Sequence, residues 1–239
     1  MRYLDLTFAT PQENLACDEA LLDWCEHGDG CETLRFWESP IHFVVVGYSN
    51  RVRANVDIGA CESNGIPVLR RCTGGGTVLQ GPGCLNYTLI LRIPETGPLT
   101  RLTSTNQFIM EQHHAALAKL TGDAVVVRGT TDLAVGDLKF SGNAQRRRQH
   151  CLLFHGTFLH NFKIALVEKY LLVPSRQPTY RRARPHAEFL TNIPLASHQI
   201  KNVLTRCWNA DDALAGFPSE MVHNLAANRY SSREWTFKL

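Results

Sequence analysis

The chain contains the run Arg70-Arg71-Cys72-Thr73-Gly74-Gly75-Gly76-Thr77-Val78, in which two cations precede three glycines and the start of an extended apolar segment. Glycine lets backbone N–H groups approach a ligand closely, and arginine supplies planar, permanently charged donors suited to phosphate or carboxylate. A glycine-rich hairpin turn beside a solvated basic pair is the alternative. The run matches neither the phosphate loop ending in Gly-Lys-Ser/Thr nor G-x-G-x-x-G. It therefore favours an anion site outside the common nucleotide motifs.

The length of 239 residues fits one large α/β-type domain with a substantial core. Hydrophobic residues make up 44% and charged residues 20%, which is ordinary for a water-soluble globular protein. No stretch approaches the roughly 20 apolar residues that a membrane span needs. The N-terminus places Asp5 where a signal peptide begins its apolar core, so we expect a cytoplasmic protein with reduced thiols.

The cysteines and the arginines form no recognised motif. The absence of a C-x-x-C pair argues against structural zinc and a disulfide framework, and the cysteines are expected to be small core residues. The net charge of +3 is mild, and positive charge concentrates in 146–148 and 181–184. We interpret both arginine runs as solvated faces, with a docking patch for an acidic partner as the alternative, and nucleic-acid binding is not favoured. The eight cysteines are Cys17, Cys25, Cys31, Cys61, Cys72, Cys84, Cys151 and Cys207.

Helical periodicity is clearest near the N-terminus. Thr10 is a good N-cap, Pro11 suits the first helical position, and Glu13 stands where a capping box places an acid. Apolar residues then recur at helical spacing until the glycines at 28 and 30 end the helix. Further helices are predicted at 55–64, 104–120, 164–172, 200–208 and 219–228.

Short apolar runs predict strands, the last two forming a hairpin closed around 146–149. Consecutive strands in the middle of the chain, with helices before, between and after them, predict an α+β fold with a mostly antiparallel mixed central sheet packed by helices. No linker divides the chain, so we expect one domain over 1–239. The predicted strands are 33–37, 42–46, 65–69, 84–93, 124–127, 132–135, 139–145 and 151–161.

Several spaced blocks together resemble the lipoate-protein ligase family, with its octanoyltransferase and biotin ligase relatives. Each block alone is weak, but they follow the family order across nearly the whole chain. The resemblance implies the class II synthetase-like catalytic domain of these ligases, without their C-terminal accessory domain. The blocks are Asn14-Leu15-Ala16-Cys17-Asp18-Glu19-Ala20-Leu21, Phe36-Trp37, Val45-Val46-Gly47-Tyr48-Ser49-Asn50, the run at 70–78, Asn86-Tyr87-Thr88, Asp132-Leu133, Lys139-Phe140-Ser141-Gly142-Asn143-Ala144-Gln145, His155-Gly156-Thr157 and Asn228-Arg229-Tyr230-Ser231-Ser232-Arg233-Glu234-Trp235.

The resemblance implies an AMP-forming reaction with lipoate, ATP and Mg²⁺. A fatty carboxylate attacks the α-phosphate of ATP, and the acyl-adenylate then passes its acyl group to a lysine of an acceptor domain. Lys139 matches the family lysine that contacts the acyl carbonyl and phosphate; an exposed strand lysine is the alternative. Both steps spread negative charge over oxygens, so positioned cations and donors are expected to supply most of the rate.

The resemblance also implies a binding set around Lys139. Asp132 is expected to order the nucleotide or its Mg²⁺, with a turn or edge residue as the alternative. His155 is either a site residue or a satisfied core histidine. The implied substrate- and adenylate-binding residues are Trp37, Arg70, Arg71, Thr73, Gly74, Gly75, Gly76, Val78, Asn86, Asp132, Ser141, Gly142, Ala144, His155, Gly156 and Thr157.

Two departures from the family pattern concern mechanism. Gln80 stands where many members carry histidine, and the chain ends at Leu239, where long bacterial ligases continue into an accessory domain. We therefore expect two partners, a lipoyl-acceptor domain and a small accessory ligase chain for adenylation, and no membrane.

Three alternatives remain open at this point. An ATP-independent octanoyl or lipoyl transferase would use a cysteine nucleophile, but residues 174–194 contain no cysteine where such enzymes carry it. Biotin ligation lacks its Gly-Arg-Gly-Arg-x-Gly-Arg signature. A non-catalytic lipoyl or acyl binder would not need Lys139. The acyl group itself, lipoate or octanoate, depends on side-chain geometry.

Overall fold

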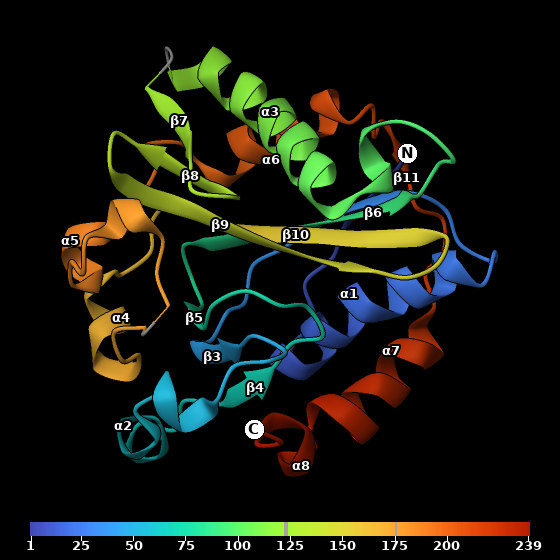
Figure 1. Cartoon of the computed structure of the whole chain (residues 1–239). Coiled ribbons are helices and arrows are strands. Elements are labelled where there is room, and N and C mark those ends of the chain that lie inside the picture. The colour runs from blue at the N-terminus through green and yellow to red at the C-terminus, as the bar shows by residue number, and fades with distance from the viewer. Residues whose placement is uncertain (122–123, 175) are drawn as a thin grey trace.

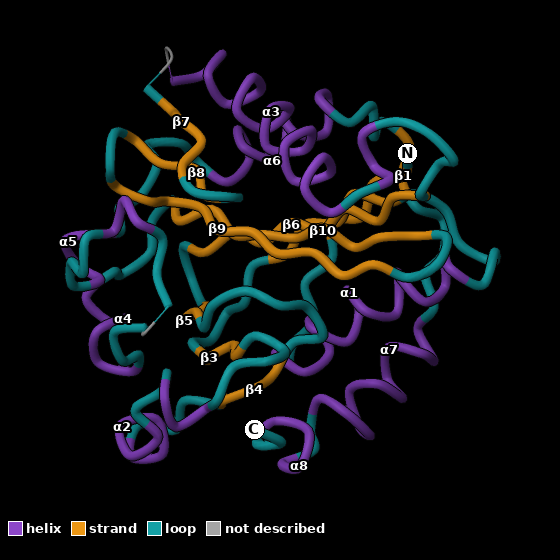
Figure 2. Tube along the Cα trace, in the orientation of Figure 1, coloured by secondary structure: helices purple, strands orange, loops and turns teal. Residues whose placement is uncertain are grey.

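The computed structural model describes residues 1–121, 124–174 and 176–239 and contains two β-sheets with helices around them (Figure 1). The larger sheet separates two helical layers, and the smaller sheet lies on the same side as the N-terminal helix (Figures 1 and 2). No helix among the described residues is long and apolar enough to cross a bilayer. The predicted α+β class, a mixed central sheet packed by helices, is confirmed.

The large sheet is antiparallel from β2 to β7, whereas β1 runs parallel to both of its neighbours. Its centre is the β6–β10 pair, where Tyr87 lies opposite Gly156. In spatial order its strands are β11 (Asp212–Ala213), β1 (Arg2–Asp5), β2 (Thr33–Trp37), β6 (Cys84–Arg92), β10 (Cys151–Leu159), β9 (Leu138–Arg147), β8 (Asp132–Val135) and β7 (Val125–Arg128).

Two long helices cover opposite faces of this sheet. Helix α3 (Leu102–Thr121) packs on one face together with α6 (Ser197–Cys207), and α1 (Pro11–Glu26) packs on the other beside α7 (Ser219–Leu225) (Figure 2). The N-terminus of α1 forms as predicted, because the Thr10 hydroxyl accepts the Glu13 N–H. The remaining short helices are η1 (Val52–Ala54), α2 (Ile58–Ser63), η2 (Pro98–Thr100), α4 (Ala165–Tyr170), η3 (Thr179–Arg181), α5 (His186–Phe189), the π-turn η4 (Ala226–Tyr230) and α8 (Arg233–Thr236).

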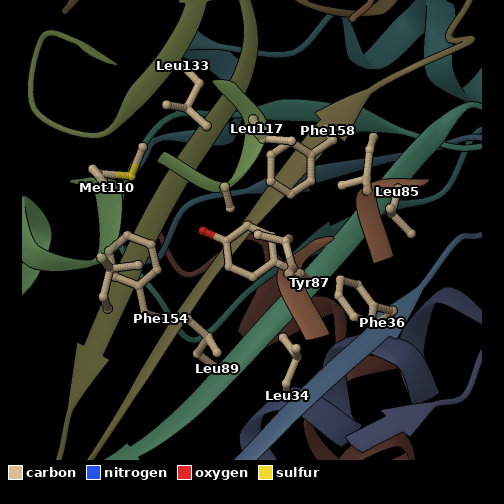
Figure 3. Packing of buried hydrophobic residues seen from close by; sticks show 14 of the residues in the cluster. Leu34, Phe36, Leu85, Tyr87, Leu89, Met110, Leu117, Leu133, Phe154 and Phe158 are labelled. Carbon is tan, nitrogen blue, oxygen red and sulfur yellow. The ribbon is translucent and has the colours of Figure 1, made fainter. Parts of the chain in front are cut away.

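The core beneath α3 and α6 is aromatic at its centre (Figure 3). Tyr87 of β6 packs against Phe158 of β10, with ring centroids 5.3 Å apart. Its hydroxyl donates to Asn143 Oδ1 at 2.6 Å, which satisfies the only polar atom of the buried ring. Since Asn143 belongs to β9, this bond fixes the middle of β9 against the core.

The small sheet consists of β3 (Phe43–Val46) between β4 (Val68–Arg70) and β5 (Val78–Gln80), parallel to the first and antiparallel to the second. Fully buried Arg70, at the end of β4, ties this sheet to the C-terminal segment. Its guanidinium donates to five backbone carbonyls, those of Gly47, Tyr48, Asn50, Trp235 and Thr236.

The element positions differ from the predictions mainly in short segments. The strands at 33–37 and 132–135 have the predicted bounds. Strands β3 and β4 correspond to the runs predicted at 42–46 and 65–69, but their assembly with β5 into a separate sheet was not predicted. Strands β1 and β11 were not predicted, because such short runs carry little periodicity. The helix expected over 219–228 ends at Leu225 and continues as a π-turn.

Replacing Arg70 with methionine is expected to destabilise the fold. The substitution leaves five carbonyls without their shared donor, so we expect the free energy of unfolding to fall by about 3–5 kcal/mol. Urea unfolding of wild type and Arg70→Met measures this difference. Arg53→Met is the matched control, because Arg53 is exposed. Equal stabilities of the Arg70 and Arg53 variants would contradict the anchoring role.

Candidate active site

A cavity of about 390 Å³ is bounded by both sheets and by residues 176–190, which we call the strap. The loop that follows Arg70 forms one wall, and β9 and β10 form another. Figure 1 shows the strap around α5 at the side of the large sheet where β8 and β9 lie, and the Leu190 backbone forms a bridge to Lys139. The cavity is therefore assembled from segments far apart in the sequence.

Most of the binding residues expected from the sequence line this cavity, but three do not. Arg70 points to the C-terminal segment instead, and Thr73 and Gly74 lie behind the wall, where both bind Arg71. The expectation that Arg70 contacts a ligand thus disagrees with its position. The lining residues among those expected are Trp37, Arg71, Gly75, Gly76, Val78, Asn86, Asp132, Lys139, Ser141, Gly142, Ala144, His155, Gly156 and Thr157.

Lys139 is held in place by an ion pair and by its own strand. Its Nζ lies 2.7 Å from Asp132 Oδ1, and both side chains are partly buried. The tip of the lysine passes over Gly142, where a Cβ would come within 2.7 Å of Nζ. The other carboxylate oxygen accepts the Tyr180 hydroxyl at 2.8 Å. Tyr180 is therefore a site residue that the sequence did not reveal.

The surroundings of Asp132 do not form a multidentate metal site. Both of its oxygens are already hydrogen-bonded, to Lys139 and Tyr180. Within residues 1–121, 124–174 and 176–239, no group of three or more His, Cys, Asp or Glu is placed to hold a metal ion. A magnesium ion held mainly by nucleotide phosphates needs only one or two protein carboxylates, so the role of Asp132 toward Mg²⁺ stays a prediction.

A chain of buried hydrogen bonds links α1 to the glycine loop. Asp18 Oδ1 accepts Arg35 Nη1 at 2.5 Å, and its Oδ2 lies 3.3 Å from His155 Nδ1. His155 Nε2 lies 2.7 Å from Thr73 Oγ1, which also accepts Arg71 Nε. Arg71 then donates to the carbonyls of Gly74 and Gly76. This series of hydrogen bonds holds the glycine loop in a bent form, in which Gly75 has a φ of 84°.

The directions of the pKa shifts agree with a neutral His155 within this series of hydrogen bonds. Burial lowers the pKa of His155, and nearby Arg71 acts in the same direction although Asp18 opposes it. Burial alone would raise the pKa of Asp18, but Arg35 and His155 hold it below its ordinary value. An ionised Asp18 accepts a hydrogen bond from His155 Nδ1–H. The other ring nitrogen, Nε2, then carries no proton and accepts a hydrogen bond from the Thr73 hydroxyl. Burial lowers the pKa of Arg71 to about 10, so it stays charged at neutral pH.

The arginine runs are mostly engaged within the protein, so their interpretation as solvated faces is wrong. Arg146 donates to the Cys72 carbonyl, Arg147 to the Leu99 carbonyl, and Arg148 to Asp23. In the strap, Arg181 is buried, and Arg184 donates to the carbonyls of Asp137, Tyr180 and Glu188. Of the strap run, Arg182 and the alanine at 183 are exposed.

The strap contributes cavity residues that sequence reasoning missed. Arg176, Arg181, His186 and Phe189 line the cavity, although this Pro- and Arg-rich stretch has no periodicity that predicts burial. Gln80, where the chain departs from the family pattern, also lines the cavity and donates to Thr157 Oγ1 at 3.0 Å.

The cysteines near the site motifs are poor nucleophiles. Cys84 is the one cysteine among the described lining residues, and burial strongly raises the pKa of its thiol. Burial also raises the pKa of Cys72 to about 12. Cys151 lies away from the lining, with its Sγ 3.2 Å from that of Cys25. The thiolate form needed for attack is therefore disfavoured at these positions.

A known protein family matches most of the chain. The family described as Lipoyl protein ligase A/B catalytic domain matches residues 10–204. The chain belongs to this family. Lipoate-protein ligase A subunit 1 of Thermoplasma acidophilum is 24% identical, covering 95% of this chain and 92% of the relative. Octanoyltransferase LipM of Geobacillus kaustophilus is 26% identical, covering 99% and 98%.

Solved structures related to the lipoyl protein ligase A/B family share the fold. A bipartite lipoate protein ligase of Thermoplasma acidophilum, described with its E2 lipoyl domain as an archaeal lipoylation system, superposes with a TM-score of 0.84 at 24% identity over 99% of this chain and 95% of the other. A lipoate-protein ligase A bound with ATP gives a TM-score of 0.81 at 25% identity over 99% and 98%. The resemblance inferred from the sequence blocks is confirmed.

Protonation of His155 is expected to weaken the fold at acidic pH. The unfolded chain has a histidine pKa of about 6.5 and the folded pKa is lower, so the unfolded state binds more protons as the pH falls below about 6.5. Stability should then decline between pH 7.5 and 5.5, and the decline should be smaller in His155→Gln. Urea unfolding at three pH values measures it. The exposed His198→Gln control should keep the wild-type slope, and the idea fails if both variants do so.

Proposed function

We propose that this chain is a lipoate-protein ligase-like enzyme that forms or uses lipoyl-AMP and transfers the lipoyl group to a lysine of an acceptor domain. The observation that carries the proposal is Lys139, an ammonium held by Asp132 on the wall of a cavity that combines apolar and cationic lining. A cavity of this kind suits a ligand with a fatty chain and a phosphate. We also propose that residues 1–239 act as one catalytic unit.

The lining supports both halves of such a ligand. Apolar side chains that suit an acyl chain include Leu15, Trp37, Phe140, Phe162 and Leu171. The basic lining residues are Arg71, Lys139, Arg176 and Arg181, against Asp132 as the one carboxylate among the described lining residues. This excess of positive charge favours an anionic ligand.

In the proposed first step the lipoate carboxylate attacks the α-phosphate of ATP and pyrophosphate leaves. Negative charge develops on the acyl and phosphate oxygens, and the Lys139 ammonium is placed to stabilise it. Asp132 and Tyr180 keep that ammonium in position. The Mg²⁺ that accompanies ATP would be held mainly by the phosphates, with Asp132 as the one carboxylate among the described lining residues, and no step is assigned to the metal.

In the proposed second step the ε-amine of the acceptor lysine attacks the acyl carbon and AMP leaves. Lys139 again faces the oxygens that gain charge. The Thermoplasma ligase is bipartite and belongs to a lipoylation system with an E2 lipoyl domain, which supports proposing two partners for this chain, a lipoyl-acceptor domain and an accessory ligase subunit.

A cysteine-dependent octanoyltransferase is the competing function, since LipM enzymes are also similar to this chain. Its nucleophile would have to come from the cavity, where Cys84 donates its thiol proton to Gln80 Oε1 at 3.1 Å. The raised pKa of Cys84 disfavours the thiolate. The ligase is therefore the better-supported proposal.

Replacing Lys139 with alanine is expected to lower acceptor lipoylation by about 10²–10³-fold, because one charge-stabilising group of the transition state is lost. Purified chain is mixed with lipoyl-AMP and an apo acceptor domain, and the acceptor is weighed. Lys163→Ala, at an exposed position outside the cavity, is the matched control. A second arm with lipoate, ATP and Mg²⁺ tests adenylation. Full activity of the Lys139 variant would remove the centre of the mechanism.

Incubation with an octanoyl carrier protein in the absence of ATP is expected to leave the enzyme mass unchanged. The physical reason is that the buried Cys84 thiol remains protonated. Intact-mass spectrometry, followed by hydroxylamine treatment to cleave thioesters, is the measurement. An octanoyl adduct that maps to Cys84, together with acceptor modification, would establish the competing function instead.

A further inference from the structure

Arg181 is the least satisfied of the buried arginines. It is 4% exposed, yet its guanidinium donates a single hydrogen bond, from Nε to the Arg184 carbonyl at 3.0 Å. Its Nη2 is fully buried and has no partner among residues 1–121, 124–174 and 176–239. The Phe189 ring lies under the guanidinium, 4.8 Å from its centroid. A buried donor without a partner costs free energy unless a ligand completes it.

The other buried arginines make more hydrogen bonds than Arg181, although Arg35 Nε and Arg70 Nη2 also lack a partner among the described residues. Arg35 is paired with Asp18 and donates to three further acceptors, and Arg70 binds five carbonyls. Arg71 makes four hydrogen bonds to Thr73 and the glycine loop. Within the described residues, Arg181 has neither a carboxylate nor a set of carbonyls, although it lines the cavity.

The electrostatic surroundings of Arg181 also favour an anionic ligand. Burial lowers the pKa of Arg181 and the Arg184 cation adds to this effect, so the charged form is held at a free-energy cost. The cation nevertheless faces a cavity lined also by Arg176 and His186. The two following residues have positive φ, 53° at Arg182 and 57° at Ala183, a conformation that non-glycine residues seldom adopt.

We propose that Arg181 binds the phosphate of the acyl-adenylate, an assignment that rests on the function proposed above. A phosphodiester brings two oxygens that can accept from a guanidinium, and it supplies the negative charge that the buried site lacks. Arg181 is adjacent to Tyr180, whose hydroxyl binds the Asp132 partner of Lys139. The two cations are thus set beside one ligand, Lys139 at the acyl carbonyl and Arg181 at the phosphate.

A free carboxylate explains this arrangement less well than a phosphate does. Lipoate carries one negative charge, and Lys139 and Arg71 already lie on the cavity wall to receive it. The additional guanidinium, whose Nη2 lacks a partner among the described residues, distinguishes the phosphate-bearing intermediate from the free acid. Arg181 is therefore expected to affect binding of the adenylate far more than binding of lipoate.

Titration calorimetry with two probes tests this assignment. The first probe is the stable phosphodiester of AMP with the alcohol corresponding to lipoate, and the second is lipoate itself. Arg181→Gln should weaken the phosphodiester by about 10- to 100-fold, the loss typical of a charge-assisted hydrogen bond, and change lipoate binding by less than about 2-fold. Arg181→Lys, which retains the charge, should show a smaller loss.

Arg182→Gln is the matched control, because Arg182 is the exposed neighbour of Arg181. It should bind both probes as wild type does. Unchanged lipoate binding and an unchanged thermal midpoint in Arg181→Gln show that the variant is folded. If that variant misfolds, the difference between the two probes in Arg181→Lys decides the question.

The outcomes separate this inference from the proposed function. Equal binding of the phosphodiester by wild type and both Arg181 variants, or equal weakening of both probes, overturns the role of Arg181 alone. Wild-type protein that binds neither probe overturns the proposed function as well. A third probe, octanoyl-phosphopantetheine, tests the other source of phosphate, and selective weakening of that probe would show that Arg181 recognises a carrier group instead of an adenylate.

Discussion

The buried ion pair between Arg35 and Asp18 is the contact from which the site geometry follows. Arg35 interrupts an apolar strand at the large sheet, and Asp18 lies on the buried side of α1, so each charge is stable only because the other is present. Asp18 then fixes the proton of His155 on Nδ1, and the free Nε2 orients Thr73. Helix, strand and glycine loop thus share one polar connection across an otherwise apolar interior.

The sequence predicted the long elements and the site motifs because these depend on local patterns. Apolar strands such as 33–37 and the cap at Thr10 can be recognised without knowing their neighbours. Pairing between β3, β4 and β5 depends on contacts distant in the chain, which the short runs predicted at 42–46 and 65–69 do not specify. Local sequence patterns therefore could not predict the small sheet, although the family blocks identified residues on its loops.

Charged residues in buried segments were the signal that sequence reasoning underused. Arg35 stands inside an otherwise apolar run, and Asp18 follows Cys17 on a helix with a buried face, so each needed a partner. The strap offered the opposite difficulty. Its arginine run at 181–184 was interpreted as a solvated face, whereas the hydrogen bond from Tyr180 to Asp132 and the burial of Arg181 make this stretch a cavity wall. No periodic pattern encodes a contact of that kind.

The shared carboxylate of Asp132 links the strap to the lysine. Asp132 accepts from Lys139 with one oxygen and from the neutral Tyr180 hydroxyl with the other, so displacement of Tyr180 removes the hydrogen bond that competes with Lys139 for the carboxylate. That change strengthens the ion pair and competes with the ligand oxygens for the ammonium. Since Arg181 follows Tyr180 in the chain, a phosphate that holds Arg181 also holds Tyr180 on Asp132. Under the proposed role of Arg181, recognition of the phosphate and presentation of Lys139 would be coupled through one short segment.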